Sequence, residues 1–133
     1  MIVLDTHALV WWASDPGRVP ARSRRLIEKA VADDVTIAVS SITIWEIAML
    51  VAAARLTLTM DVTTWLGHVQ ALPFLSFMPV DNQIALRAVQ LPGFPHRDPA
   101  DRMITATTLG LGATLVTADS RLRGYRPLRT VWD

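Results

Sequence analysis

The sequence has no cysteine, one lysine (Lys29) and two glutamates, Glu28 and Glu46. Without cysteine the chain can form neither disulfides nor thiolate metal sites, which suits a reducing compartment. The longest unbroken apolar run, residues 47–54, is far shorter than the roughly 20 residues that cross a bilayer, and no basic segment precedes an apolar run at the N-terminus. We therefore expect a cytoplasmic protein with no membrane contact.

Charge of one sign is also scarce, because the formal net charge is only +1. A balance this even creates no overall field that would indicate a nucleic-acid partner. The distribution is more informative: all but one of the 13 cationic residues are arginine, and one group lies near the C-terminus, at Arg121, Arg123, Arg126 and Arg129. Arginine suits bidentate contacts with phosphate. A solvated surface run explains the same group equally well.

The remaining composition and patterning predict one compact α/β domain over residues 1–133. The chain is 51% hydrophobic and 19% charged, and no linker, repeat or low-complexity tract divides it. Short apolar runs predict strands at residues 1–4, 35–39, 76–80, 114–117 and 128–132. Apolar spacings of three and four predict helices at residues 21–32, 42–54, 62–72, 82–90 and 99–109. This alternation predicts a mostly parallel central sheet of four to five strands, flanked by helices on both faces.

Two aspartates follow predicted strands. Asp5 comes directly after the first strand, and Asp119 comes two residues after Thr117, where another strand ends. In an open parallel sheet, ligands bind beyond the carboxyl ends of the strands, where the strand order reverses. Both carboxylates are expected at that edge. The structural alternative is that they only cap the turns or helices that follow.

Three further acids lie near predicted helix starts. Glu46 interrupts a helix that is otherwise apolar on nearly every face, so its charge needs a partner, a metal ion or a proton; the alternative is an ordinary surface position. Asp98 precedes Pro99 as a helix cap, and Asp101 is the third helical residue. Asp101 is preferred over Asp98 as the functional acid of this segment, because capping explains Asp98 fully.

Clustered carboxylates repel one another unless a cation neutralises them. Sites with few protein ligands, all oxygen, suit Mg2+ or Mn2+ and leave positions for water and substrate phosphate. The pattern therefore favours metal-assisted hydrolysis of a phosphodiester.

The segments MIVLDTHALVWW, AVSSITIWEIAML and HRDPADRMITATTLGLGATLVTADSRL occur in an order and at a spacing that resemble the PIN-domain ribonucleases, and within them the VapC-like toxins of bacterial toxin–antitoxin pairs. The resemblance covers nearly the whole chain. It implies a single PIN-like nuclease domain that cuts RNA with Mg2+ or Mn2+ and is neutralised by a cognate antitoxin. The catalytic acids that it implies are Asp5, Glu46, Asp101 and Asp119.

The resemblance also implies supporting residues around these acids. Metal contacts would come from Asp5, Asp101 and Asp119, with Asp98 as an alternative for the third position. Supporting hydroxyls would come from Thr6, Ser40 and Thr117. Apart from the resemblance, the chemistry of arginine leads to the hypothesis that Arg102, Arg121, Arg123 and Arg126 contact neighbouring RNA phosphates. Tryptophans with Val10, Ile44 and Ile47 would leave an apolar patch for a second subunit, making a homodimer, or for the antitoxin.

Other functions fit less well. A response-regulator-like phosphoacceptor domain also gathers aspartates at strand ends, but needs a late lysine, and the only lysine is Lys29. A non-catalytic binding module whose acids only cap helices is the third interpretation. Zinc is disfavoured because His7, His68 and His96 lack paired spacing and are expected to be structural or exposed.

Overall fold

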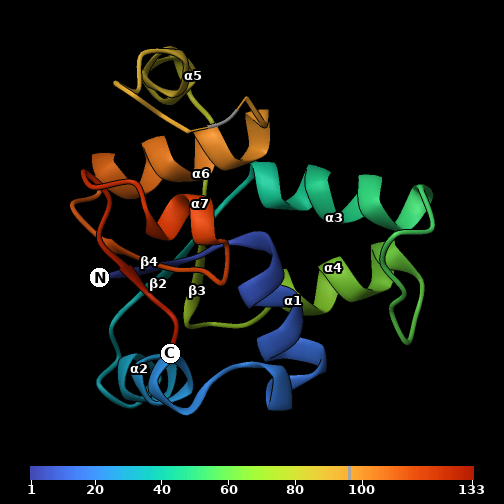
Figure 1. The fold of residues 1–133 in the computed structure, drawn as a ribbon. Coiled ribbons are helices and arrows are strands. Elements are labelled where there is room, and N and C mark those ends of the chain that lie inside the picture. Colours follow the sequence, from blue (N-terminus) through green and yellow to red (C-terminus); the bar gives the residue numbers. More distant parts are fainter. Residues whose placement is uncertain (96) are drawn as a thin grey trace.

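The computed structural model describes residues 1–95 and 97–133. It contains a five-stranded sheet in the order β3-β2-β1-β4-β5, and every neighbouring pair is parallel (Figure 1). The strands are β1 (Ile2–Leu4), β2 (Ile37–Ser40), β3 (Leu75–Met78), β4 (Thr114–Val116) and β5 (Thr130–Val131). The predicted parallel sheet is confirmed, with five strands.

The central strand, β1, determines where the sheet can bind a ligand. From β1 the chain builds outward to β2 and β3 on one side, and later to β4 and β5 on the other. The strand order therefore reverses between β1 and β4, which is the switch point where ligands bind in open α/β sheets. Asp5 follows β1, and Asp119 lies three residues beyond the end of β4, so both predicted acids are at this point.

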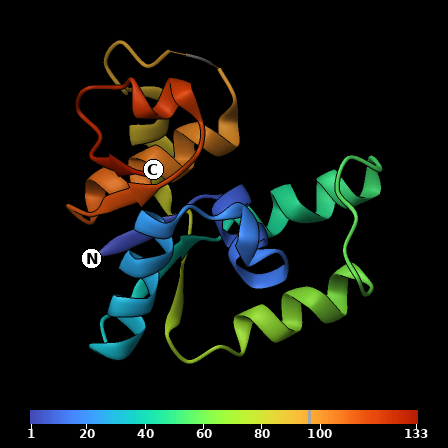
Figure 2. The ribbon, with the colours of Figure 1, turned by 60° about the horizontal axis from the view of Figure 1, so that its bottom comes forward.

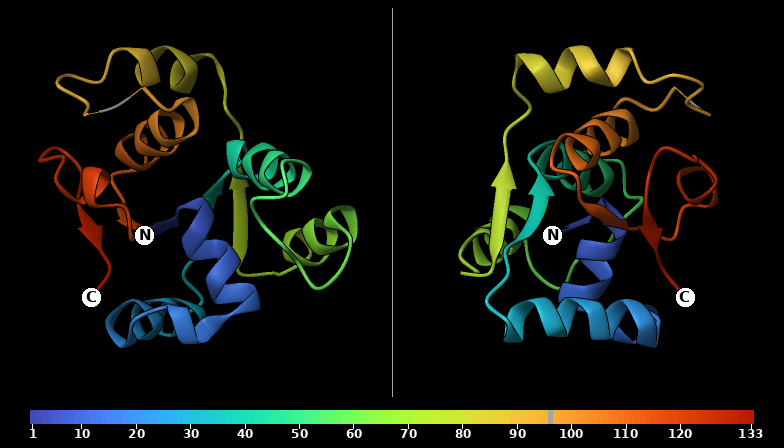
Figure 3. Two further views of the ribbon diagram at one scale, coloured as in Figure 1. Left: turned by 45° about the vertical axis from the view of Figure 1, so that its right-hand side comes forward. Right: turned by 90° about the vertical axis from the view of Figure 1, so that its left-hand side faces the viewer.

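Helices cover both faces of the sheet, as predicted. They are α1 (Thr6–Ser14), the 3-10 turn η1 (Pro16–Arg18), α2 (Ala21–Ala32), α3 (Ile42–Ala52), α4 (Val62–Gln70), α5 (Asn82–Val89), α6 (Pro99–Gly110) and α7 (Ser120–Arg123). One core cluster joins Leu4 and Val39 to residues of α1, α2 and α4, and the other joins Val3 and Leu115 to Ile104 of α6. Helix α2 lies on one side of the molecule and α5 and α6 on the other (Figure 3). Helices α3 and α4 extend together to one side (Figure 2).

The structure differs from the sequence-based expectation at α1 and α7, which were not predicted. The core side of α1 includes three successive buried residues, Ala8, Leu9 and Val10, so the spacing of three and four that reveals an amphipathic helix is faint. Helix α7 has only four residues. Strand β3 ends before Pro79, which lacks the N–H for a ladder hydrogen bond.

The irregular segment predicted before α6 includes His96, which lies outside the described residues. The expectation that this histidine is structural or exposed therefore stays a prediction. No helix in the described part of the chain is long and apolar enough to span a membrane.

Candidate metal-binding and catalytic site

A cavity of about 490 Å3 opens at the carboxyl ends of β1 and β4 and contains every acid singled out from the sequence. Its walls come from α1, the segment around α3, the start of α6 and the start of α7. The lining residues are Asp5, Thr6, His7, Trp11, Glu46, Met49, Leu50, Arg55, Asp98, Asp101, Ala118, Asp119 and Arg121. Five carboxylates from four separate segments therefore share one hollow.

Asp5 is the most enclosed of these acids, with a relative exposure of 6%. Its Oδ1 accepts a hydrogen bond from the Ala8 N–H at 2.8 Å and so caps α1, and its Oδ2 accepts one from the Thr117 hydroxyl. Burial raises the pKa of Asp5 to about 6, and the charge of Glu46 adds to this rise. The two hydrogen bonds and nearby His7 oppose it. The carboxylate is thus fixed in direction and costly to ionise without a cation.

Thr117 connects the two strand-end acids, because its hydroxyl oxygen also accepts a hydrogen bond from the Asp119 N–H at 3.1 Å. Asp119 caps α7 through Oδ1, which accepts from the N–H of Arg121 at 2.8 Å. Burial acts to raise the pKa of Asp119, but the hydrogen bonds from Arg121 and Leu122 and the charge of Arg121 outweigh it and lower the pKa. Asp119 therefore stays ionised while Asp5 resists ionisation.

Asp101 lies where the charges of the other acids converge. Burial raises its pKa to about 7, and the charges of Asp98, Glu46, Asp119 and Asp5, in decreasing order, all act in the same direction. Asp98 is exposed and caps α6, because its Oδ1 accepts from the Asp101 N–H at 3.1 Å. Its predicted capping role is confirmed.

Glu46 approaches the cavity from α3, opposite the strand ends. It is partly buried in the second turn of that helix, where the sequence placed it. Its charge raises the pKa of both Asp5 and Asp101, so it faces the same hollow as these aspartates. Met49 and Leu50 of the same helix line the cavity beside it.

The donor set fits a hard divalent cation. All five acidic donors are carboxylates, and a cation among them would relieve the repulsion that raises the pKa of Asp101. Within residues 1–95 and 97–133, no three acidic or histidine side chains are positioned to ligate one ion together. Mg2+ can still bind where fewer than three side chains ligate it directly, because it keeps several waters and needs only one or two direct carboxylate ligands.

The three predicted hydroxyls occupy different places. Thr117 contacts Asp5, as described above. Thr6 lines the cavity, and its Oγ1 lies 3.2 Å from Oγ1 of Thr43, a buried contact between α1 and α3. Ser40 is buried, and its Oγ accepts a hydrogen bond from the Ile42 N–H at 3.3 Å at the start of α3. Thr6 and Ser40 therefore help to position α3, which holds Glu46.

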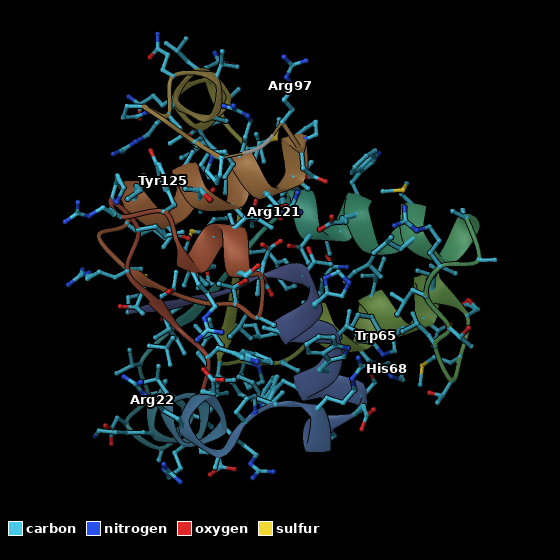
Figure 4. All side chains as sticks on the ribbon, viewed as in Figure 1. Arg22, Trp65, His68, Arg97, Arg121 and Tyr125 are labelled. Carbon is cyan, nitrogen blue, oxygen red and sulfur yellow. The ribbon has the colours of Figure 1, made fainter. Side chains whose placement is uncertain are left out.

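The arginines predicted to contact phosphate are spread more widely than the acids. Arg121 lines the cavity, and its Nη2 lies 3.5 Å from Asp119 Oδ2. Figure 4 shows Arg121 in the central region between α7 and α3. Arg123 pairs with Asp133 at 2.7 Å, and Arg126 is exposed. Neither of these two lines the cavity.

Arg102 contacts structural elements instead of the cavity. Its Nη1 donates to the Ala88 carbonyl at 2.9 Å, and its guanidinium lies 5.1 Å from the centre of the Phe94 ring. These contacts join α6 to the end of α5 and to the segment that follows it.

The sequence-based prediction did not include six of the lining residues, which are His7, Trp11, Met49, Leu50, Arg55 and Ala118. Two of them lie on α1, which was not predicted. Arg55 is the next charge after Glu46 along the chain, and this is the sequence signal that indicates it.

The predicted apolar patch needs correction. Val10 and Ile47 have exposures of 3% and 0% and belong to the core, so they cannot form a docking surface. They are buried because they lie on the sides of α1 and α3 that pack into the first core cluster. Trp45 of α3 is 54% exposed.

Comparisons with known proteins agree with this geometry. The PIN domain family model matches residues 2–126. The chain is 37% identical over 133 residues to Ribonuclease VapC22 of Mycobacterium tuberculosis, covering 98% of both chains. Its fold is similar to VapBC2 from Rickettsia felis bound to a promoter DNA fragment (TM-score 0.72, 20% identity, 100% of both chains) and to a toxin–antitoxin complex from Klebsiella pneumoniae (TM-score 0.63, 19% identity, 98% and 96%). The predicted family is therefore confirmed, and the chain belongs to the PIN-domain family.

Proposed function

We propose that this protein is a divalent-metal-dependent endoribonuclease that hydrolyses phosphodiester bonds of RNA and acts as the toxin of a toxin–antitoxin pair. The observation that carries this proposal is the convergence of five carboxylates on one cavity at the switch point of the sheet. The 37% identity to a protein named a ribonuclease supports RNA as the substrate.

The resident ion would be Mg2+ or Mn2+. Asp5, Asp101 and Asp119 would hold it directly or through water, with Asp98 at the exposed side. When bound, the ion supplies Lewis-acid stabilisation of the phosphate and lowers the pKa of attacking water.

The chain's own residues supply orientation and charge balance. The Ala8 N–H and the Thr117 hydroxyl fix the direction of the Asp5 carboxylate. Glu46 approaches from α3, where its carboxylate can hold the attacking water and accept its proton. Arg121 and Arg55 line the same cavity, where they would neutralise phosphates next to the reacting one.

The structure gives less support to RNA contacts by the other predicted arginines. Arg102, Arg123 and Arg126 stand outside the cavity wall, so they would contact only phosphates farther along the strand. Their substitution should weaken binding mainly at low salt.

The proposed partners are RNA, a cognate antitoxin and a second copy of the chain, and the proposed compartment is the cytoplasm. The likeness in fold to a toxin–antitoxin complex supports the antitoxin. A short upstream reading frame whose product co-purifies with this chain and abolishes RNA cleavage would establish that partner. A product that leaves cleavage unchanged would exclude it.

The phosphoacceptor alternative loses support from the structure. Lys29 lies on α2, exposed and paired with Asp33, and does not line the acidic cavity. A binding module whose acids only cap helices would show no metal-dependent change in melting temperature.

The decisive experiment incubates purified protein with structured RNAs in Mg2+ or Mn2+, and in chelator, beside Asp5→Asn. Asparagine is as good a helix cap as aspartate, so the start of α1 should be preserved while the charge is lost. Asp81→Asn makes the same change at the exposed cap of α5 and is the matched control. We expect metal-dependent cleavage by the wild type and Asp81→Asn only. Equal cleavage by Asp5→Asn would refute the mechanism.

A further inference from the structure

We propose that His7, backed by Trp11, forms a stacking subsite for a nucleobase of the RNA, on the α1 wall of the acidic cavity. The inference rests on the proposed ribonuclease function and adds a specificity determinant to it. It starts from the exposed ring of His7, which lies against Trp11, a side chain that also packs on the first core cluster.

His7 and Trp11 lie one helical turn apart on α1 and both line the cavity that contains Asp5 and Asp101. Their ring centroids are 5.6 Å apart with an interplanar angle of 52°. His7 is exposed, whereas Trp11 is partly buried. An exposed ring supported from behind by a larger ring is the kind of platform on which single-stranded nucleic acids stack their bases.

Trp11 is held in place from two further directions. The Arg18 guanidinium lies 4.2 Å from the centre of its ring, and the Trp132 ring lies 5.7 Å away, at 51°. These contacts join η1 and the C-terminal segment to α1. Because Arg18 covers part of Trp11, the accessible ring of the pair is that of His7, and Trp11 acts as the positioning residue.

The adjacent tryptophan, Trp12, lies on the same helix but does not face the acidic cavity. Trp12 packs edge-on against Phe74, with centroids 5.5 Å apart, and faces a different cavity of about 500 Å3. Among the described residues, no acidic side chain lines that second cavity. The two adjacent tryptophans thus point to different surroundings, and only Trp11 faces the carboxylates.

The charges of the cavity favour a base over an anionic group at this place. Five carboxylates repel any anion that is not neutralised by the resident ion or by Arg55 and Arg121, whereas a base is uncharged. His7 is two residues from Asp5, so a base on its ring belongs to a nucleotide next to the reacting phosphate. The subsite would therefore select among bases by how strongly they stack.

The test measures kcat/KM on a cleaved RNA and on versions in which one nucleotide near the cut is abasic. In the wild type, one abasic position should lower kcat/KM roughly 5- to 100-fold, the range expected for losing one stacked base. For His7→Ala, kcat/KM on the intact RNA should already be lower than that of the wild type by the same factor. The abasic position should then lower kcat/KM of this variant little further. His7→Phe should restore the wild-type response. His68→Ala, at an exposed histidine of α4 outside the acidic cavity, is the matched control.

A binding measurement separates this proposal from the proposed function. A short fluorescein-labelled single-stranded RNA is titrated by anisotropy in Ca2+, which also takes oxygen ligands. Weaker binding by His7→Ala than by His7→Phe supports the subsite even if no cleavage is found. The opposite outcome is that the wild type cleaves RNA and His7→Ala binds and cleaves RNA as well as the wild type does, with the same loss at the abasic position. That result would refute the subsite and leave the proposed nuclease function intact.

Discussion

The acidic cavity and the outer surface both use aspartate as the N-cap of helices, but the pKa of the buried cap Asp5 differs from that of the surface cap Asp61. Aspartate caps begin α1, α6 and α7 at the cavity, and aspartate caps begin α4 and α5 at the surface. At the surface, hydrogen bonds from Thr64 lower the pKa of Asp61. In the cavity, burial raises the pKa of Asp5 to about 6, although this carboxylate also accepts two hydrogen bonds. A cap therefore fixes where a carboxylate lies, and burial beside other acids decides its chemistry.

The largest effect is expected at the centre of the cavity. Asp101→Asn should lower metal-dependent RNA cleavage by at least about 100-fold, because changing even an outer partner of a metal ligand costs roughly 10- to 100-fold. It should also raise the melting temperature in chelator, since it removes a charge that four carboxylates repel. Asp81→Asn should change neither quantity. Parallel kinetics and thermal melts check this, and an active Asp101→Asn would break the distinction between the two regions.

The second-largest effect is expected in the pH dependence of stability, which the buried cavity acids change in a way that the surface caps do not. An unfolded aspartate has a pKa near 3.8, whereas folded Asp5 and Asp101 have values of about 6 and 7. Both acids bind protons more tightly when folded, so they reduce the free energy of unfolding as pH rises from about 4, and the loss is complete above about 7. For Asp5 alone this is about 3 kcal/mol.

Denaturation in chelator across this pH range measures the effect, and the difference between wild type and Asp5→Asn isolates one group. The stability of the wild type should fall more steeply with pH than that of Asp5→Asn. Parallel curves would mean that Asp5 ionises in the folded protein as easily as in the unfolded chain.

A smaller effect is expected from the hydroxyl that joins two cavity acids. Thr117→Val removes a donor to Asp5 and an acceptor for the Asp119 N–H, and should destabilise the protein by about 1–3 kcal/mol. Thr105→Val is the matched control, because that hydroxyl is buried and has no hydrogen-bond partner among the described residues. Chemical denaturation should show this control to be neutral or stabilising. Equal losses would show that the Thr117 hydrogen bonds contribute nothing specific.

The smallest effect belongs to the surface caps. Asp81→Ala removes the acceptor for the Ile84 N–H at the start of α5 and should cost about 1 kcal/mol of stability while leaving cleavage unchanged. Denaturation and RNA cleavage on the same preparation measure both. A loss of activity here would mean that α5 contributes to the site in a way that the cavity does not indicate.

The convergence of the acids was predictable from the sequence for a general reason. Parallel strands end at one edge of a sheet, which places Asp5 and Asp119 there, and helix α6, which leads back to the start of β4, begins near that edge with Asp101. Glu46 was identified because a charge is costly in a helix that is otherwise apolar on nearly every face. These inferences needed no knowledge of side-chain direction.

The cationic and aromatic residues of the site were harder to predict, because their positions depend on tertiary contacts. Arg102 follows Asp101 in sequence, but its guanidinium reaches back to Ala88 and Phe94. His7 and Trp11 lie on a helix whose buried residues run consecutively, which hides its period. Long side chains choose among several partners, and the sequence does not rank those partners.

The most direct test of the central claim is the change in melting temperature that Mn2+ produces at a pH above 7, which exceeds the pKa values of about 6 for Asp5 and about 7 for Asp101. Wild type and Asp81→Asn should show the same metal-dependent rise, because an ion that binds only the folded state stabilises it by mass action. Asp5→Asn and Asp101→Asn should show a much smaller one. An equal rise in all four proteins, or none in the wild type, would contradict a metal site built from these carboxylates.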